Sequence, residues 1–209
     1  MMKRLFIALA AFVGFSLAAA HAESSNPVDL VSDTSRQVLD LLKKDDGKNS
    51  RQVRAQVEAL VVPKFDFKRM TALAVGRGWR DATPDQQAEL SSQFQSLLTR
   101  TYASTMWRFK QAQIDVKPNA TLTPDGREAT VRSEVLLPNS ADKKPVSVDY
   151  ILYRTPQGWR VYNVIVEGAS LVTVYRNQFN EEIRKNGIDG LIKVLRTKND
   201  SVPPVARAG

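Results

Sequence analysis

The sequence contains no cysteine and only one histidine, His21. Without cysteine the chain forms no disulfide and offers no thiol nucleophile, so its stability has to come from an apolar core. His21 falls inside the leader described below, which leaves the rest of the chain without the residues of a Ser-His-Asp triad or of the usual zinc sites. Carboxylate pairs and Ser-Lys dyads remain open, but no local pattern marks one. We therefore expect a protein that is not an enzyme and that holds neither a metal nor a cofactor.

Long apolar runs are also scarce. The run from Leu5 to Ala20, about 16 residues, is shorter than the roughly 20 that a membrane-spanning helix needs. A charged start, Lys3-Arg4, precedes this run, and the small-x-small pattern of residues 20–22 follows it. These features predict a signal peptide over residues 1–22 with cleavage after Ala22, and hence an exported protein. No later segment is apolar enough to cross a bilayer.

The charge balance is moderately positive. The whole chain carries +8, and loss of Lys3 and Arg4 with the leader leaves a mature chain of about +6. The basic residues are dispersed rather than clustered, which is typical of a solvated surface. Together with the exported destination, this argues against nucleic acid as a partner and is compatible with acidic partners.

The first half of the chain has the apolar spacing of helices. The expected helices cover residues 27–44, 49–62, 67–75 and 84–109. Thr83, Pro84 and Gln86 supply the N-cap, first-turn proline and capping-box glutamine of the longest one. The sequence between the last two helices, GRGWR at 76–80, predicts an exposed turn in which Gly76 is a left-handed cap.

From Gln111 the apolar period changes to two, which predicts strands. The expected strands cover residues 111–117, 128–137, 146–154 and 159–167, and short turns between them favour an antiparallel meander. Ser170 then starts a helix that Gly187 ends, and a last short helix begins at Asp189. The order is that of an α+β fold with helices on one face of a curved sheet. We expect one domain over residues 23–197, with a helical part at 23–110, the sheet at 111–168 and closing helices at 170–197. Residues 198–209 are expected to form a flexible tail.

Two long stretches resemble a known family. Residues 65–87 read FDFxxMTxLAVGRxWRxATPxQQ, and residues 94–103 continue with FxxLLxRTYA. Residues 158–179, GWRVYNVIVEGASLVTVYRNQF, are similar to the pattern GW-x-V-Y-x-V-x-x-E-G-x-S-L-x-x-x-Y-R. These motifs look like those of the MlaC family, the periplasmic phospholipid-binding proteins of the Mla pathway of lipid transport, also called toluene-tolerance auxiliary proteins. Asn163 departs from that family, which often has Asp at this position.

The resemblance implies an NTF2-like curved antiparallel sheet with helices on its concave side and a small helical subdomain. Between them would lie a pocket for the acyl tails of a phospholipid, which is cargo and not a cofactor. The implied partners are an outer-membrane lipoprotein–porin complex and an inner-membrane ABC transporter with an MCE-domain ring. Shuttling between these complexes in the periplasm would maintain outer-membrane lipid asymmetry. The protein is expected to act as a monomer.

The resemblance makes the apolar faces predicted above, taken as a group, the candidate walls of this pocket, although each single residue fits an ordinary closed core better. The candidate lining residues are Leu73, Val75, Leu97, Leu98, Tyr102, Val131, Val135, Leu137, Val146, Val148, Tyr150, Leu152, Trp159, Val161, Leu171, Val174 and Tyr175. Arg77 and Arg80 are candidates for contact with a lipid head group or a partner protein.

Two other functions are compatible with the sequence. An NTF2-like periplasmic enzyme acting on a hydrophobic substrate would need carboxylates that converge in the pocket. Asp149 and Glu134 are the nearest candidates, but both alternate away from the apolar faces. The second is an adaptor protein with a closed core and no ligand.

Overall fold

The computed structural model describes residues 26–103, 106–138 and 144–201. The predicted leader at 1–22 and residues 202–209 of the predicted tail lie outside these ranges. None of the helices within these ranges combines the length and the apolar character that crossing a bilayer requires.

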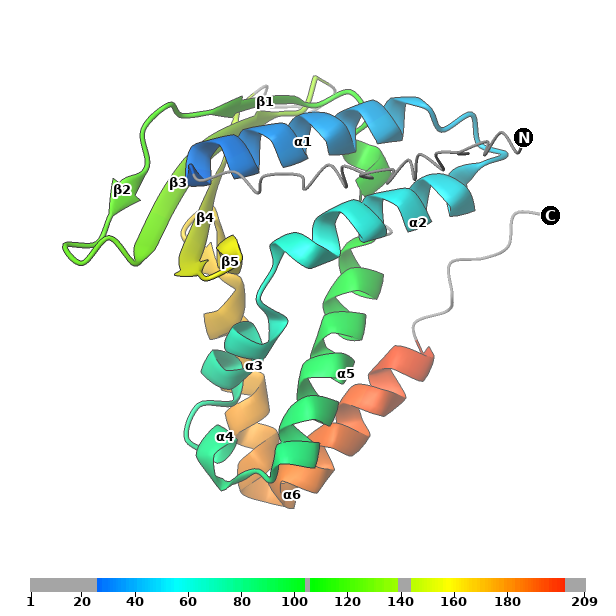
Figure 1. Ribbon diagram of the computed structural model, residues 1–209. Helices are drawn as coiled ribbons and strands as arrows, with labels where there is room; N and C mark the ends of the chain where they lie inside the picture. Colours follow the sequence, from blue (N-terminus) through cyan, green and yellow to red (C-terminus); the bar gives the residue numbers. More distant parts are fainter. Residues whose placement is uncertain (1–25, 104–105, 139–143, 202–209) are drawn as a thin grey trace, which may run out of the picture.

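The chain runs from helices into a sheet and back into a helix (Figure 1). The first part consists of α1 (Pro27–Lys43), α2 (Ser50–Val61), the 3-10 turn η1 (Val62–Lys64), α3 (Phe67–Val75), α4 (Gly78–Asp81), α5 (Pro84–Ala103) and the 3-10 turn η2 (Met106–Phe109). The second part consists of β1 (Gln113–Val116), β2 (Thr121–Leu122), β3 (Glu128–Leu136), β4 (Val146–Thr155), β5 (Gly158–Val166), β6 (Ala169–Ser170) and α6 (Leu171–Ser201). This order confirms the predicted α+β class.

The strands form one sheet in the order β1-β3-β4-β5-β6, with β2 paired to β3, and neighbouring strands are antiparallel. The meander is therefore confirmed, while the two-residue strands β2 and β6 were not predicted. One irregularity lies in β5, where Ile151 pairs with Asn163 and Leu152 with Val161. Tyr162 is thus an additional residue, a bulge that reverses the alternation of faces beyond it.

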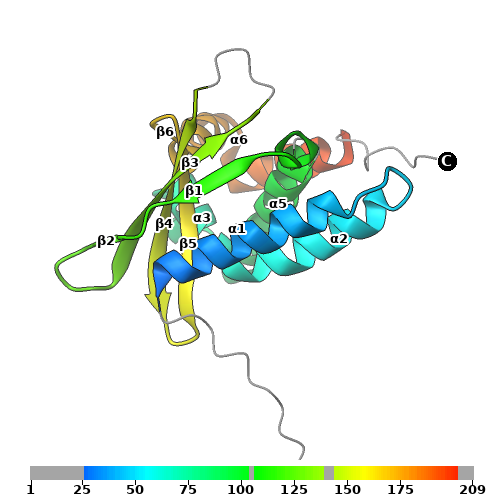
Figure 2. The same ribbon diagram turned by 90° about the horizontal axis from the view of Figure 1, so that it is seen from above.

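Helix α1 covers one end of the sheet, and we call the covered side the inner face (Figure 2). Leu30 and Val31 of α1 pack against Ala129, Val131 and Leu152, and each of these side chains is at most 5% exposed. Trp159 and Val161 of β5 complete this cluster. These five sheet residues form the closed half of the inner face, a dry core that burial of apolar area stabilises.

Helices α3, α5 and α6 extend away from the sheet and share a second core (Figure 1). Phe94 of α5 lies at its centre, with ring centroids 4.9 Å from Tyr175 and 5.1 Å from Phe179. A third, smaller cluster joins Leu42 of α1 to α2. The helical core and the core beneath α1 are separate clusters, and Phe65 packs against both.

Two predictions for the helical part need correction. The exposed turn at residues 76–80 contains helix α4 instead, and Trp79 is partly buried against the helical core. This packing is close, because a Cβ on Gly78 would lie 3.1 Å from the Ile188 side chain and 3.2 Å from that of Ile183. The helix predicted to reach Phe109 ends at Ala103.

The closing helices also differ in extent from the prediction. The expected break at Gly187 is present as a kink, because this residue has φ +70° inside α6. The helix then continues to Ser201, so residues 198–201 are helical and not part of a tail. Asn199 explains the extension, since its side chain is buried and donates to the Gln93 carbonyl over 2.9 Å.

The predicted capping box of α5 is confirmed and can be tested. The Thr83 backbone N–H donates to Gln86 Oε1 over 2.9 Å, and the Gln86 N–H donates to Thr83 Oγ1 over 3.2 Å. We expect Thr83→Ala to lower the free energy of unfolding by about 1 kcal/mol, because one helical N–H loses its acceptor. Urea unfolding measures the change, and Thr83→Ser, which keeps the oxygen, is the control. Equal losses in both variants would show that the hydroxyl does not cap the helix.

Candidate functional site

Exposed apolar side chains gather where the sheet meets α6. Among the described residues four large apolar side chains are exposed, and three of them are Tyr102 (45%), Val166 (44%) and Val174 (46%). Val166 pairs with Ala169 in β6, directly before α6 begins, and Val174 lies on the first turn of α6. Tyr102, near the end of α5, hydrogen-bonds with Tyr175. Large exposed apolar patches in folded proteins mark sites for apolar ligands or partners, so these three side chains are candidates for such a site.

The inner face of the sheet continues toward this surface. By register Val148 pairs with Val166 and Tyr150 with Val164, so all four side chains lie on the inner face. Val146, Val148 and Val164 are only partly buried, and Val164 also packs against the core beneath α1. We call Val146, Val148, Val164 and Val166 the open half of the inner face.

Tyrosine hydroxyls are the polar groups at the edge of this surface. Tyr175 interacts with Tyr102 across the α5–α6 contact and also hydrogen-bonds with Thr101. Burial raises the pKa of Tyr175 to about 12, and the neighbouring Tyr102 adds to the effect. Both rings therefore remain neutral at physiological pH and suit an apolar surface with few charges.

The raised pKa predicts an alkaline loss of stability. The folded protein holds the Tyr175 proton more tightly than the unfolded chain, whose pKa is near the ordinary 10.0. The stabilising contribution is complete below pH 10 and is lost as the pH rises toward 12. We expect urea midpoints to fall over this range more steeply for the wild type than for Tyr175→Phe. Identical slopes in the two proteins would contradict the assignment.

Asn163 fixes the start of α6 against the sheet. Its side chain accepts from the Val172 N–H over 3.2 Å and exchanges hydrogen bonds with Ser170 Oγ. In the turn before β6, both Glu167 (φ +49°) and Gly168 (φ +78°) have a positive φ. Glycine adopts this conformation without strain. Asn163, the departure noted in the sequence, thus holds the β5–β6 turn and the first turn of α6 together.

The structure distributes the predicted lining residues over three environments. Those in or against the helical core are Leu73, Val75, Leu97, Leu98, Leu171 and Tyr175. Those in or against the core beneath α1 are Val131, Tyr150, Leu152, Trp159 and Val161. The remaining ones are Tyr102, Val135, Leu137, Val146, Val148 and Val174, of which Tyr102 and Val174 are exposed and Val135 is buried. Which of these residues touch a ligand stays a prediction.

The sequence-based list omits Val164 and Val166, because strict alternation from Trp159 and Val161 points to Asn163 and Ile165. The bulge at Tyr162 places the two valines on the inner face instead. The only signal in the sequence is the run Val164-Ile165-Val166, which is apolar at every position and hides the change of face.

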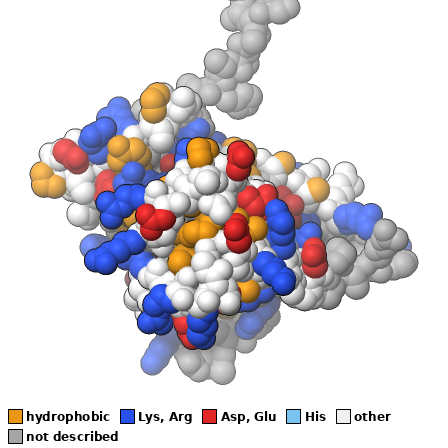
Figure 3. All heavy atoms as spheres, turned by 90° about the horizontal axis from the view of Figure 1, so that it is seen from below, with side chains coloured by type: hydrophobic (Ala, Val, Ile, Leu, Met, Phe, Trp, Pro, Cys, Tyr) orange, Lys and Arg blue, Asp and Glu red, His pale blue; other side chains and the backbone are white. Residues whose placement is uncertain are grey.

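Arg80 of α4 and Arg77, which directly precedes α4, are exposed at the opposite end of α5 from Tyr102. The span from Pro84 to Tyr102 is about 27 Å at the helical rise of about 1.5 Å per residue. The structure therefore does not bring these arginines to the exposed apolar surface, and contact with a partner is the remaining prediction for them. Figure 3 shows this end of the molecule, where basic side chains are interspersed with acidic ones.

The carboxylates considered for catalysis lie on the outer face. Asp149 pairs with Arg132, and Glu134 pairs with Ser147. The residues on either side of each carboxylate along its strand face inward, so the carboxylate itself faces outward. Glu134 also accepts from Lys117 Nζ over 2.9 Å. The two carboxylates therefore point away from the open half. Within the described ranges no three His, Asp or Glu side chains group closely enough to hold a metal ion.

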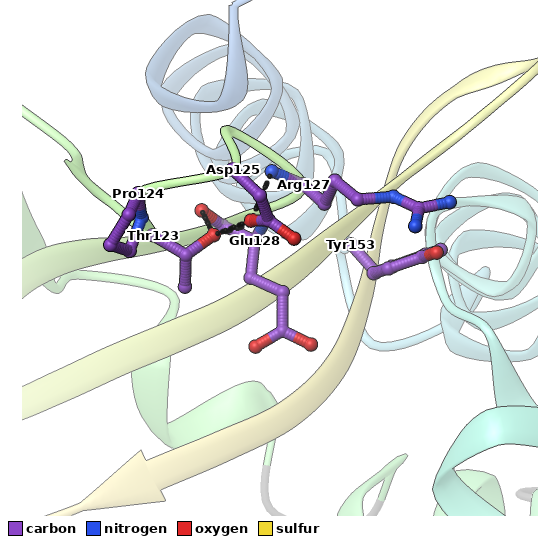
Figure 4. A pocket seen from close by; sticks show the side chains of 6 residues that line it. All are labelled: Thr123, Pro124, Asp125, Arg127, Glu128 and Tyr153. Carbon is purple, nitrogen blue, oxygen red and sulfur yellow. Dashed lines mark hydrogen bonds between the residues drawn. The ribbon is translucent and has the colours of Figure 1, made fainter.

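A groove of about 370 Å³, lined mainly by polar and charged residues, lies elsewhere, between the β2–β3 turn and β4 (Figure 4). Its carboxylates already have partners. Asp125 accepts from Thr123 Oγ1 over 2.6 Å, and Glu128 accepts from Arg69 over 2.8 Å. The Arg69 guanidinium also stacks on Tyr153, 4.0 Å from the ring centroid. These contacts attach α3 to the sheet.

Comparison with known proteins identifies relatives of the whole fold. The toluene tolerance protein ttg2D of Pseudomonas putida is 28% identical over 191 residues, which is 90% of this chain and 84% of that protein. The structure of a phospholipid-binding protein from Ralstonia solanacearum, solved in complex with a phospholipid, is similar with a TM-score of 0.72. It is 35% identical, and the match covers 83% of this chain and 96% of that one. The family described as MlaC protein matches residues 32–197. With the antiparallel sheet, the helical body and both sequence motifs in place, this chain belongs to the MlaC family.

Proposed function

We propose that this protein is a periplasmic phospholipid carrier that buries acyl tails against the open half of the inner face. The observation that carries the proposal is the likeness, over most of both chains, to a protein solved with a bound phospholipid. The exposed apolar side chains of α5, β5 and α6 support it, because they offer surface that no other described element covers.

Energetics explain why a carrier needs this surface and little chemistry. Each buried methylene is worth roughly 0.8 kcal/mol, so moving a two-tailed lipid through water without a carrier costs on the order of 20 kcal/mol. Apolar side chains offset that cost, and no acid, base or nucleophile is needed. The outward direction of Asp149 and Glu134 agrees with transport rather than turnover.

The proposal extends to the route of the lipid. The leader over residues 1–22 would direct the chain to the periplasm. The carrier would then exchange lipid between an outer-membrane lipoprotein–porin complex and an inner-membrane ABC transporter with an MCE-domain ring, which maintains lipid asymmetry. Its positive charge would favour association with acidic partner surfaces, and salt would slow that association.

Direct analysis of bound lipid tests the proposal. The chain from Glu23 onward is purified after export, extracted with organic solvent and analysed by mass spectrometry. We expect co-purified phospholipid, and uptake of labelled phosphatidylglycerol from vesicles by the delipidated protein. A protein that carries no phospholipid and takes none from vesicles is not a phospholipid carrier.

A further inference from the structure

A chain of hydroxyl groups crosses the apolar interior between the sheet and α1. Tyr150 of β4 hydrogen-bonds with Ser133 of β3 and with Ser35 of α1. Ser133 is 2% exposed, and its Oγ donates to the Val148 carbonyl over 3.0 Å. We call Tyr150, Ser133 and Ser35 the hydroxyl bridge.

The hydroxyl bridge lies at the boundary between the two halves of the inner face. On one side, Leu30 and Val31, one turn before Ser35, close over Val131 and Leu152. On the other side, the next inner-facing residue of β4 is Val148, which is partly buried and pairs with the exposed Val166. Along β4 and β5 the inner face therefore changes from closed core to more open apolar surface at the ring of Tyr150. On β3, Ser133 and Val135, the partners of Val148 and Val146, stay buried.

Polar groups at such a boundary resist displacement. Buried hydroxyls are costly unless they are hydrogen-bonded, and the members of the bridge satisfy one another. An acyl chain that pushed between Tyr150 and Ser35 would break the hydrogen bond between them and offer no polar partner in return. It would also have to part α1 from the sheet, where packing is tight. The bridge thus presents a fixed wall to an apolar ligand.

From this geometry we infer that the hydroxyl bridge is the floor of the acyl-tail site and limits the length of tail that the protein accepts. The inference rests on the proposed carrier function and adds a selectivity to it. Tails approach over Val166 and Val148 and stop at Tyr150. From Val146 to Tyr150 the open surface runs about 13 Å along β4, at about 3.3 Å per residue. The floor therefore acts on the terminal methylenes, each of which changes affinity about fourfold.

Competition among tail lengths tests the floor. Delipidated wild-type protein and variants are loaded from vesicles that mix dimyristoyl-, dipalmitoyl- and distearoyl-phosphatidylglycerol equally, and the bound species are measured by mass spectrometry. Tyr150→Ala removes the ring, and we expect the bound ratio of stearoyl to palmitoyl lipid to rise at least about fourfold. Val148→Phe fills the space above the floor, and we expect a shift of similar size toward myristoyl lipid.

Leu30→Ala is the matched control, because it opens a comparable space on the closed side of the bridge. We expect it to lower stability without changing the bound tail lengths. An unchanged ratio in folded Tyr150→Ala, or an equal shift in Leu30→Ala, overturns the floor. Should Tyr150→Ala not fold, an unchanged ratio in Val148→Phe overturns it. If wild-type protein takes up no lipid, the carrier function itself is contradicted. If all variants take up lipid with the same ratio of tail lengths as the wild type, only the floor is contradicted.

Discussion

Val148→Glu is expected to deprive the protein of lipid while leaving it folded. Val148 is partly buried on the open half, where a carboxylate can reach water as long as no ligand is bound. A bound acyl chain would enclose that carboxylate in apolar surroundings, and burial of an unpaired charge costs several kcal/mol. We therefore expect affinity for phospholipid to fall by a factor of at least about 100, equivalent to roughly 3 kcal/mol. The ratio of phospholipid to protein after extraction measures the loss, and thermal melting reports on the fold.

Two variants separate charge from structure. Val148→Gln introduces a neutral amide of about the same size as the glutamate side chain. It is expected to weaken phospholipid binding less than Val148→Glu, because a neutral amide is less costly to bury than a carboxylate. Leu152 lies on the same strand as Val148, but its side chain is 0% exposed beneath α1. Leu152→Glu is therefore expected to destabilise the fold itself. From the sequence alone, Val148 and Leu152 are equivalent candidates for the wall of the pocket. Full lipid content in folded Val148→Glu would remove Val148 from the lipid-binding surface.

The helices were predictable because their signals are local. Asp66 precedes α3 and its Oδ1 accepts from the Arg69 N–H over 2.8 Å, while Thr83 and Gln86 cap each other at the start of α5. Such contacts depend on residues three positions apart and can be read directly from the chain. The end of α6 was not predictable, because it depends on the hydrogen bond between Asn199 and Gln93, which are 106 residues apart.

The candidate site was predictable only in outline. The alternation of apolar and polar residues assigns Val131 and Val148 to the same face of the sheet without distinguishing them. The structure confirms that both side chains face inward. Only the course of α1 decides that the first is dry core and the second is open. The bulge at Tyr162 is likewise set by pairing between strands, which no single strand sequence specifies. Sequence motifs thus indicated the family, while the division of the inner face required the three-dimensional arrangement.

Phe94→Ala is expected to be the most destabilising substitution within the helical body. Phe94 is 0% exposed, and its ring makes edge-on contacts with Tyr175 and Phe179. Truncation removes the buried ring and leaves a cavity that the rigid crossing of α5 and α6 cannot fill, for a cost of about 3–5 kcal/mol. The loss of the two aromatic contacts of Phe94 accounts for part of this decrease in stability, at about 0.5–1.5 kcal/mol per pair. Urea unfolding followed by circular dichroism should show a lower midpoint with an unchanged slope.

Phe94→Leu is the control, because it keeps most of the apolar volume and should lose less than half as much stability. The helical core is separate from the hydroxyl bridge, so both variants, where folded, are expected to keep the wild-type preference for tail length. A loss below about 1 kcal/mol for Phe94→Ala would mean that α5 and α6 close the cavity by moving together. In that case the helical body is deformable, and the contact between Tyr102 and Tyr175 would shift with α5 and α6.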